Sequence, residues 1–338
     1  MFMNFTKIVF FMILFLSVLI SISSVSWIGA WMGLEMNLLS IIPLMINLKN
    51  VLSTEATLKY FLSQTLASSI FLFSIILLSF FDILNFMYFS EYFFNIIMNS
   101  TLLLKMGAAP FHFWFPEVME GLNWMMIIII LTWQKITPMI LISYNFNFNF
   151  IYFIIIISIM IGSIGGLNQI DLRKLLSYSS INHMGWMLSS IYISNFYWLI
   201  YFFFYSFLNI SIIITFNKFN IYFFPQLYSI LNYNLTLKFM LFCNFLSLGG
   251  LPPFMGFLPK WIIIQNLTTK TPFLMMIMVI LTLITLFFYI RISFSAFMLY
   301  YSEIKWMIFL NYKMNFILFC NFLSLFGLLM MNFLYYFF

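Results

Sequence analysis

The sequence predicts an all-α integral membrane protein, a single membrane domain over residues 1–338 with about eleven transmembrane helices. Three observations lead to this prediction. Of the 338 residues, 64% are hydrophobic and 7% are charged, whereas soluble domains carry about 25% charged residues. Apolar segments of roughly 20 residues, the length that crosses a bilayer, follow one another along the chain. The polar stretches between them are too short to hold a soluble domain.

The hydropathy fits eleven spans in chain order. Their approximate limits are 5–22, 25–46, 54–80, 93–114, 122–143, 149–168, 172–192, 195–217, 238–265, 273–296 and 314–336. We expect the first to be a retained helix rather than a signal peptide, because no small-residue cleavage site follows it. The small residues in Gly29-x-x-x-Gly33 and Gly162-x-x-x-Gly166 favour close helix packing.

The basic residues of the loops indicate how the chain is oriented. An odd number of spans places the two termini on opposite sides of the membrane. The side of the N-terminus would carry Lys7, Lys49, Arg173, Lys174, Lys218, Lys238, Lys305 and Lys313, and the other side only Lys270, with Asp82 and Glu91. Because lysine and arginine gather in cytoplasmic or matrix loops, we expect the N-terminus on that side.

Two of the spans are predicted to be broken helices. Gly107 and Pro110 interrupt the fourth span, and Gly250, Pro252 and Pro253 interrupt the ninth. Proline removes a backbone donor and glycine adds conformational freedom. The backbone groups that a break frees are tolerated at membrane depth only beside protein or water. Broken helices at corresponding positions therefore indicate a transport site.

The two breaks share the pattern G-x-x-P-F-x-x-x-x-x-P, at an offset of 143 residues. This repetition predicts an internal duplication. The expected parts are a first repeat near 25–168, a second near 172–296 and a C-terminal helix at 314–336. Because five spans separate the breaks, the repeats are expected to run in opposite directions through the membrane. The halves differ chemically, since Lys135 of the first would correspond to Met278 of the second.

Five ionisable side chains fall inside predicted spans: Glu35, Lys59, Lys105, Lys135 and Lys260. A charge near the centre of a bilayer is costly, so these groups are expected to face protein, each other or water. In one interpretation, Glu35 pairs with a lysine and staples two helices together. One acid cannot pair with four lysines, and burial favours the neutral form of a lysine. A proton relay is therefore the favoured interpretation.

Two histidines are further candidates for the relay. His183 ends a polar run that begins at Ser177, and His112 follows the first break. Imidazole titrates near neutral pH and can pass protons on, whereas a lone histidine in a membrane often only bonds a neighbouring helix. Both interpretations stay open for these two residues.

Cysteine spacing and charge exclude other kinds of site. Cys243 and Cys320 lie far apart in apolar segments, with no C-x-x-C spacing and no cluster with histidine. This argues against an iron–sulfur or zinc site within the chain. The net charge is +6 without any run of basic residues, which argues against nucleic acid as a partner.

The candidate residues lie in longer runs of sequence that resemble a known family. The runs are EMNL at 35–38, STEATLKYF at 53–61, KMGAAPFHFW at 105–114, TWQK at 132–135, YSSINHMG at 178–185 and GLPPFMGFLPKW at 250–261. Over essentially the whole chain they closely resemble the chain 2 family of NADH–ubiquinone oxidoreductase, the mitochondrially encoded antiporter-like subunits of respiratory complex I. The residue usage resembles that of insect mitochondrial chains.

The resemblance implies a fold of two inverted five-helix repeats, each with one broken helix, and a role for each buried charge. By position, these roles are a coupling pair (Glu35 and Lys59), the lysine of the first broken helix (Lys105), the central lysine (Lys135), the end of the second half-channel (Lys260) and the polar stretch between the halves (His183). Bacterial members have three further N-terminal spans without a counterpart here, which fits the shorter animal members.

The resemblance also implies the surroundings of the chain. It implies a multi-pass subunit of the mitochondrial inner membrane, with the N-terminus in the matrix and the C-terminus in the intermembrane space. No cofactor is expected in this chain, since FMN, the iron–sulfur clusters and ubiquinone belong to other subunits. Expected partners are the antiporter-like chain 4, chain 4L, other membrane-arm and accessory subunits, and lipids such as cardiolipin.

Two other functions stay open at this point. One is a stand-alone cation/proton antiporter, which would be isolated without flavin or iron. The other is a structural subunit without its own proton path, against which the four lysines inside predicted spans argue.

Overall fold

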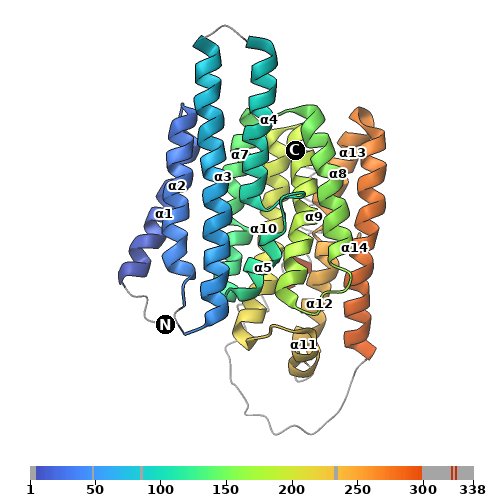
Figure 1. Cartoon of the computed structure of the whole chain (residues 1–338). Helices are drawn as coiled ribbons and strands as arrows, with labels where there is room; N and C mark the ends of the chain where they lie inside the picture. The colour runs from blue at the N-terminus through green and yellow to red at the C-terminus, as the bar shows by residue number, and fades with distance from the viewer. Residues whose placement is uncertain are drawn as a thin grey trace. The chain divides into compact units, whose positions relative to one another are not determined.

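The computed structural model describes residues 5–47, 49–83, 87–231, 235–298, 321–322 and 324–325. In this described part the regular elements are α-helices (Figure 1). An isolated β-bridge joins Asp171 and Phe223 outside any strand. The all-α prediction is confirmed. The predicted C-terminal helix at 314–336 lies almost wholly outside the described residues, as do Lys305 and Lys313.

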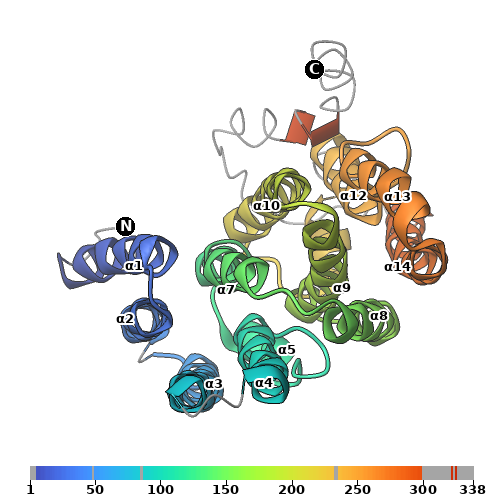
Figure 2. The ribbon, with the colours of Figure 1, turned by 90° about the horizontal axis from the view of Figure 1, so that it is seen from above.

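The chain divides into two compact units, Met1–Ser158 and Ile159–Phe338. The first contains α1 (Phe5–Ser23), α2 (Trp27–Met45), α3 (Val51–Ile83), α4 (Met87–Met106), α5 (Trp114–Gly121), α6 (Trp124–Leu131) and α7 (Trp133–Tyr144), and α8 (Phe148–Gly165) crosses the division. Helix α2 packs against α1 and α3, both α4 and α5 pack against α3, and α7 packs against α1, α4 and α6. Figure 2 shows α1, α2 and α3 side by side.

The second unit contains α9 (Leu172–Ile193), α10 (Asn195–Phe219), α11 (Phe224–Leu231), α12 (Leu235–Gly249), α13 (Phe257–Lys270) and α14 (Pro272–Met298). Helix α9 packs against α10 and α13, and α12 packs against α10, α13 and α14. The middle of α9 is buried on all sides, including its serines and His183. A helix that is buried all round belongs inside a bundle rather than at a lipid surface.

Seven described segments are long and apolar enough to cross a membrane. They are Phe5–Ser23, Trp27–Met45, Val51–Phe81, Trp124–Tyr144, Phe148–Gly165, Asn195–Phe219 and Pro272–Met298. Helices α4 and α9 are long enough but too polar to pass the same test. Ten of the predicted spans coincide with a helix or a pair of helices, and the total of eleven stays a prediction.

The fifth predicted span, 122–143, is not one continuous helix. Helix α6 ends at Leu131 and α7 begins at Trp133, and Thr132 between them has φ −112° and ψ −70°. The Thr132 hydroxyl donates to the Ile128 carbonyl at 2.7 Å. A side-chain bond of this kind competes with the helical ladder and bends helices. The predicted span is confirmed as the candidate membrane segment Trp124–Tyr144, with an irregularity at Thr132.

The small-residue patterns are confirmed as sites of close helix packing. A Cβ atom on Gly33 would lie 2.7 Å from the backbone nitrogen of Ser21, on α1. A Cβ atom on Gly162 would lie 2.5 Å from the backbone nitrogen of Asn182, on α9. Both distances are too short for any larger residue, so these glycines let the helix backbones approach.

Both predicted helix breaks are present. Helix α4 ends at Met106 and is followed by Gly107 with φ +70°. Helix α12 ends at Gly249 and is followed by Gly250 with φ +85°. Positive φ is readily accessible only to glycine, so the glycines stop both helices at matching positions of the sequence repeat.

The hydrogen bonds that close the two helix ends also match. The Ala108 N–H donates to the Leu103 carbonyl at 3.0 Å, and the Leu251 N–H donates to the Leu246 carbonyl at 3.3 Å. This is the Schellman arrangement of a helix end. Each donor and each acceptor is offset from its counterpart by 143 residues. The repeated sequence pattern therefore produces the same local structure twice.

Candidate functional site

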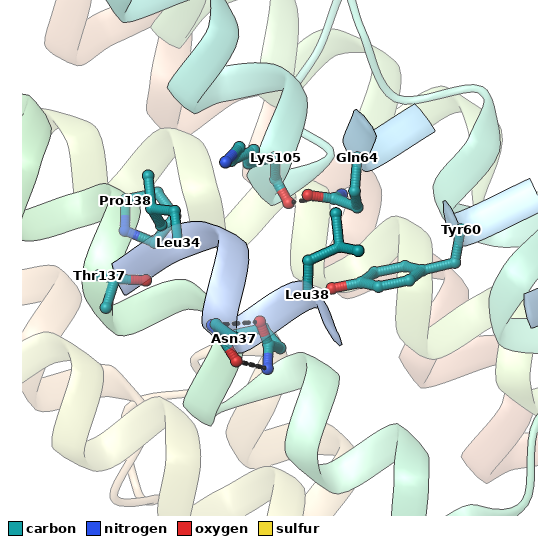
Figure 3. A pocket seen from close by; sticks show the side chains of 9 residues that line it. Leu34, Asn37, Leu38, Tyr60, Gln64, Lys105, Thr137 and Pro138 are labelled. Carbon is teal, nitrogen blue, oxygen red and sulfur yellow. Dashed lines mark hydrogen bonds between the residues drawn. The ribbon is translucent and has the colours of Figure 1, made fainter. Parts of the chain in front are cut away.

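The first helix break places Lys105 beside a polar cavity. Lys105 is the penultimate residue of α4, and 8% of its surface is exposed. The cavity has a volume of ≈ 10 Å³, and its polar lining consists of Asn37, Tyr60, Gln64, Lys105, Gln134 and Thr137 (Figure 3). This is about the smallest volume that holds a water molecule. The lining is thus polar enough, and the cavity just large enough, for hydration.

Glu35 is the acid that acts on Lys105. It lies on α2, and its carboxylate interacts electrostatically with the Lys105 ammonium group. No direct ion pair involves Glu35 among the residues that the structure describes. Charges inside a protein are screened less than charges in water. The structure therefore brings two of the predicted relay residues into electrostatic range.

Uncharged side chains hold the end of α4. The Gln64 side chain donates from Nε2 to the Lys105 carbonyl at 3.2 Å. The Trp114 indole donates from Nε1 to the Leu104 carbonyl at 3.2 Å. The last carbonyls of a helix lack partners within the helix. Because Gln64 and Trp114 satisfy them, the Lys105 ammonium group is not used to hold the helix end.

On the other side of the cavity, an amide pair joins α2 to α7. Asn37 donates from Nδ2 to Oε1 of Gln134 at 2.9 Å, and Gln134 donates from Nε2 to Oδ1 of Asn37 at 2.9 Å. The dashed lines in Figure 3 mark these two bonds. The nearby Thr137 hydroxyl is buried and has no hydrogen-bond partner in the described part of the chain. This wall of the cavity thus combines a paired group and an unpaired polar group.

Lys59, the predicted coupling partner of Glu35, forms ion pairs with two other carboxylates. Lys59 Nζ lies 2.9 Å from Glu55 and 2.8 Å from Glu117, and the Lys59 side chain is 41% exposed. Glu55 is one turn away on the same helix, the spacing at which oppositely charged side chains meet. Neither carboxylate was predicted to be a partner of Lys59. Lys59 is therefore ion-paired within the first turns of α3, and its place in the proton relay stays a prediction.

Lys135 is the most deeply buried of the predicted lysines. It lies on α7, and 1% of its surface is exposed. Its Nζ lies 5.7 Å from the ring centre of Phe115, on α5, within the range of a cation–π contact. Lys135 does not line the cavity beside Lys105. The two lysines thus sit on either side of the first break, one facing the cavity and one facing α5.

In the second unit, Lys260 binds the broken end of α12. Its Nζ donates to the carbonyls of Leu248 at 3.2 Å and Gly249 at 2.9 Å. These are the last carbonyls of the helix, where a positive charge is favoured by the helix dipole. The same Nζ lies 5.9 Å from the Trp186 ring. Lys260 therefore caps the end of α12 with an amino group, whereas the caps at the first break that the described residues provide are the neutral Gln64 and Trp114.

His183 lies in a second small cavity, which reaches the same break. Its Nδ1 lies 2.8 Å from the Tyr201 hydroxyl, at hydrogen-bonding distance. The cavity, of ≈ 10 Å³, is lined by His183, Tyr201, Tyr205, Ser247 and Leu248, among others. Since the Leu248 carbonyl accepts from Lys260, the structure brings His183 and Lys260 to the same part of the second unit.

Sequence reasoning missed the uncharged members of both sites. Asn37 and Gln134 lie in the runs EMNL and TWQK, next to predicted charges. The signal that could have found them is an amide side chain in an otherwise apolar span, which needs a hydrogen-bond partner when buried. Tyr60 and Tyr201 carry no such signal, because tyrosine is common in this chain.

No group of three or more histidine, cysteine, aspartate and glutamate residues is placed to hold a metal ion within the described ranges. Cys243 is buried with a free thiol. Cys320 lies outside the described residues.

The fold and the site together define a class of protein: a multi-pass membrane protein with buried lysines beside two broken helices. Residues 24–285 match the family model described as NADH:quinone oxidoreductase/Mrp antiporter, TM. This match covers more than half of the chain, and the chain belongs to that family.

Within the family, the chain is similar to curated insect proteins named NADH-ubiquinone oxidoreductase chain 2. It is 53% identical over 332 residues to the protein of Anopheles gambiae and 54% identical over 332 residues to that of Aedes aegypti, covering 97% of each chain in both cases. The protein of Locusta migratoria is 43% identical over 93% of this chain and 92% of its own length. The resemblance that the sequence motifs predicted is confirmed.

Solved structures share the fold at low identity. A chain of respiratory complex I from Thermus thermophilus, solved with bound aureothin, matches with a TM-score of 0.82 and 21% identity, covering 96% of this chain and 78% of that chain. A chain of the Mrp complex from a Dietzia species matches with a TM-score of 0.70 and 14% identity, over 84% of this chain and 59% of that chain. At these identities the comparison supports the fold alone.

Proposed function

We propose that the chain is a core membrane-arm subunit of NADH:ubiquinone oxidoreductase (complex I) and takes part in proton translocation coupled to electron transfer. The observation that carries this proposal is a buried lysine, Lys105, at a helix break beside a polar cavity and within electrostatic range of Glu35. The family and the identity to insect chain 2 proteins supply the reaction. The chain would be part of an enzyme without holding a redox centre itself.

The geometry suggests how proton transfer could be driven. A negative charge on Glu35 stabilises the protonated form of Lys105 by Coulomb attraction, and loss of that charge favours proton release. The acceptor would be Lys135, which lies on α7 directly after Gln134, a residue that lines the cavity. Because Lys59 has its own carboxylates, the pair that responds to electron transfer would be Glu35 and Lys105.

Lys260 and His183 would handle protons in the second unit. The ammonium group of Lys260 is bound by carbonyls of α12, and His183 lies beside a small cavity that Leu248 also lines. Imidazole can accept and donate a proton near neutral pH. A proton passing His183 would thus come close to Lys260.

The remaining expectations concern the surroundings of the subunit. We place it in the mitochondrial inner membrane, with the N-terminus in the matrix, where most of the loop lysines and arginines would lie. FMN, the iron–sulfur clusters and ubiquinone would be bound by other subunits. Partners would be chain 4, chain 4L, accessory subunits and lipids such as cardiolipin.

The variant Lys105→Met tests the proposal directly. It keeps an unbranched side chain, one atom shorter, and removes the charge. In reconstituted complex, we expect coupled proton transfer through this subunit to be lost. We expect the rate at which the complex oxidises NADH, measured with an artificial electron acceptor, to equal that of the unmodified complex. Unchanged proton pumping by the assembled variant would contradict the proposed function.

A stand-alone cation/proton antiporter is the second candidate. The family model covers Mrp antiporters, and the fold matches a chain of an Mrp complex with a TM-score of 0.70. Gentle solubilisation and purification of the chain separates the two functions. Co-purification with flavin and iron indicates a complex I subunit, and purification without either indicates an antiporter.

A further inference from the structure

We propose that Asn37 and Gln134 are positioning residues for proton transfer. Their reciprocal amide pair would hold α2 against α7, which also packs on α4. It would in this way keep Glu35 of α2 in electrostatic range of Lys105 of α4. This inference rests on the proposed function, because it assigns a task to two uncharged residues at the same site.

The geometry of the pair is that of a strong and specific connection. Two hydrogen bonds of 2.9 Å run in opposite directions between the same two side chains, so neither amide can turn without breaking both. Asn37 is buried, with 4% of its surface exposed. A buried amide that loses its partner keeps the full cost of its desolvation. The pair therefore resists separation of the two helices more than an exposed contact would.

The pair crosses a place where little else joins the two helices. Helix α2 packs mainly against α1 and α3, and α7 packs mainly against α1, α4 and α6. The polar cavity lies between α2 and α7, and both members of the pair line it. Figure 3 shows Asn37 on the side of the cavity opposite Lys105. The amide pair is thus a bridge over a cavity rather than part of a packed interface.

Helix α7 also has a weakened backbone in this region. Thr132 interrupts it at its start, and Pro138 lies inside it. Proline lacks the N–H that would otherwise donate to the carbonyl of Gln134, four residues earlier. A helix with fewer backbone bonds depends more on its side chains for a fixed position. Gln134 lies between these two irregular points.

Both amides lie close in sequence to charged residues of the site. Asn37 follows Glu35 by two residues on α2, and Gln134 directly precedes Lys135 on α7. Coulomb energy falls with the distance between charges and with hydration of the space between them. A shift of α2 away from α7 would enlarge the cavity, admit water and weaken the effect of Glu35 on Lys105.

The pair is suited to this task because it is neutral. A salt bridge at the same place would add charges that compete with Glu35 for Lys105, and a buried ion pair also carries a large desolvation cost. Two amides satisfy each other and leave the local field to the residues that change protonation. The chemistry of the pair therefore fits positioning rather than proton transfer, since amides do not titrate.

The test compares complexes that carry Asn37→Leu, Gln134→Leu, the exchange Asn37→Gln with Gln134→Asn, and Lys105→Met. The measurement is protons pumped per NADH oxidised in reconstituted, fully assembled complex. We expect Lys105→Met to lower this ratio. We expect each leucine variant to lower it by at least half as much. We expect the exchange to regain at least half of that loss, because it restores an amide pair of the same total length. A role in stability alone would not produce this pattern.

Asn95→Leu is the matched control. Asn145 donates from Nδ2 to Oδ1 of Asn95 at 2.9 Å, so this variant removes a similar amide bond between α4 and the end of α7, away from the cavity. We expect it to pump at the ratio of the unmodified complex. Should the leucine variants not assemble, Asn37→Ser replaces them, since serine stays polar but cannot form the reciprocal pair, and the same expectation applies.

Two results would overturn the inference. One is an assembled leucine or serine variant that pumps at the unmodified ratio, and the other is an exchange variant that pumps no better than the single variants. If Lys105→Met is uncoupled in the same series, such a result removes only the positioning role. If Lys105→Met pumps normally, the proposed function itself is wrong.

Discussion

At the scale of single residues, the two helix breaks have the same backbone but different caps. Gln64 and Trp114 bind the last carbonyls of α4, whereas Lys260 binds those of α12. At the first break the caps are neutral, and the Lys105 side chain lines the cavity. At the second break, the Lys260 amino group itself binds the end of α12. The helix dipole favours a positive charge at that position.

Replacing Lys260 tests this difference. Lys260→Met removes the amino group that donates both hydrogen bonds to the end of α12. Each buried carbonyl that loses its partner costs about 1–3 kcal/mol. Lys260→Gln keeps an N–H donor but loses the charge. We expect the methionine variant to lower the thermal stability of the purified complex more than the glutamine variant does. Equal stability of the methionine variant and the unmodified complex would show that Lys260 does not hold the end of α12.

Charged site residues could be predicted from the sequence, and their neutral partners could not. Lys105, Lys135 and Lys260 are conspicuous because a charge in an apolar span demands an explanation. The ion pair of Lys59 with Glu117 was not predicted, because the sequence does not reveal that α5 brings Glu117 to it. Asn37 and Gln134 are far apart in the chain, so only the fold makes them a pair.

At the scale of secondary structure, α5 is the element that connects the first break to its surroundings. It begins at Trp114, whose indole bonds the end of α4, and it ends at Gly121. A Cβ atom on Gly121 would lie 2.4 Å from the Leu52 carbonyl oxygen and 2.6 Å from the Ala56 side chain, both on α3. Together with the bond between Lys59 and Glu117, this close approach fixes α5 against α3.

The variant Gly121→Ala tests how tightly α5 is held. The added methyl group has no room, and such overpacking typically costs about 1–3 kcal/mol. We expect a lower melting temperature of the purified complex. Gly249→Ala is a suitable comparison, since its Cβ atom would meet the nearest side-chain atom at an ordinary 3.4 Å. If both variants melt alike, α3 and α5 are not packed as closely as described.

The helices could be predicted because lipid imposes length and apolarity on each span. Predicted limits such as 5–22 and 172–192 agree with α1 and α9 within about a residue. The interruption at Thr132 escaped prediction because it contains no glycine or proline and depends on a single threonine bond. The short helix α11 escaped because it lies between predicted spans, where hydropathy carries no signal.

At the scale of the whole molecule, the duplicated breaks carry different polar and charged groups. The first unit combines a free ammonium group, a cavity and an acid, and the second combines a bound ammonium group with a histidine. The sequence repeat predicted the common backbone. It also predicted that the halves are chemically unequal, since Lys135 has methionine at the matching position.

The most direct measurement is the number of protons pumped per NADH oxidised by reconstituted complex that carries Lys135→Ala. Lys135 is the most buried of the lysines described, and it lies outside the cavity and its amide pair. If Lys135 takes part in proton transfer, we expect this ratio to fall while assembly and NADH oxidation are retained. An unchanged ratio would contradict it, and would make the buried lysines helix staples in a scaffold subunit.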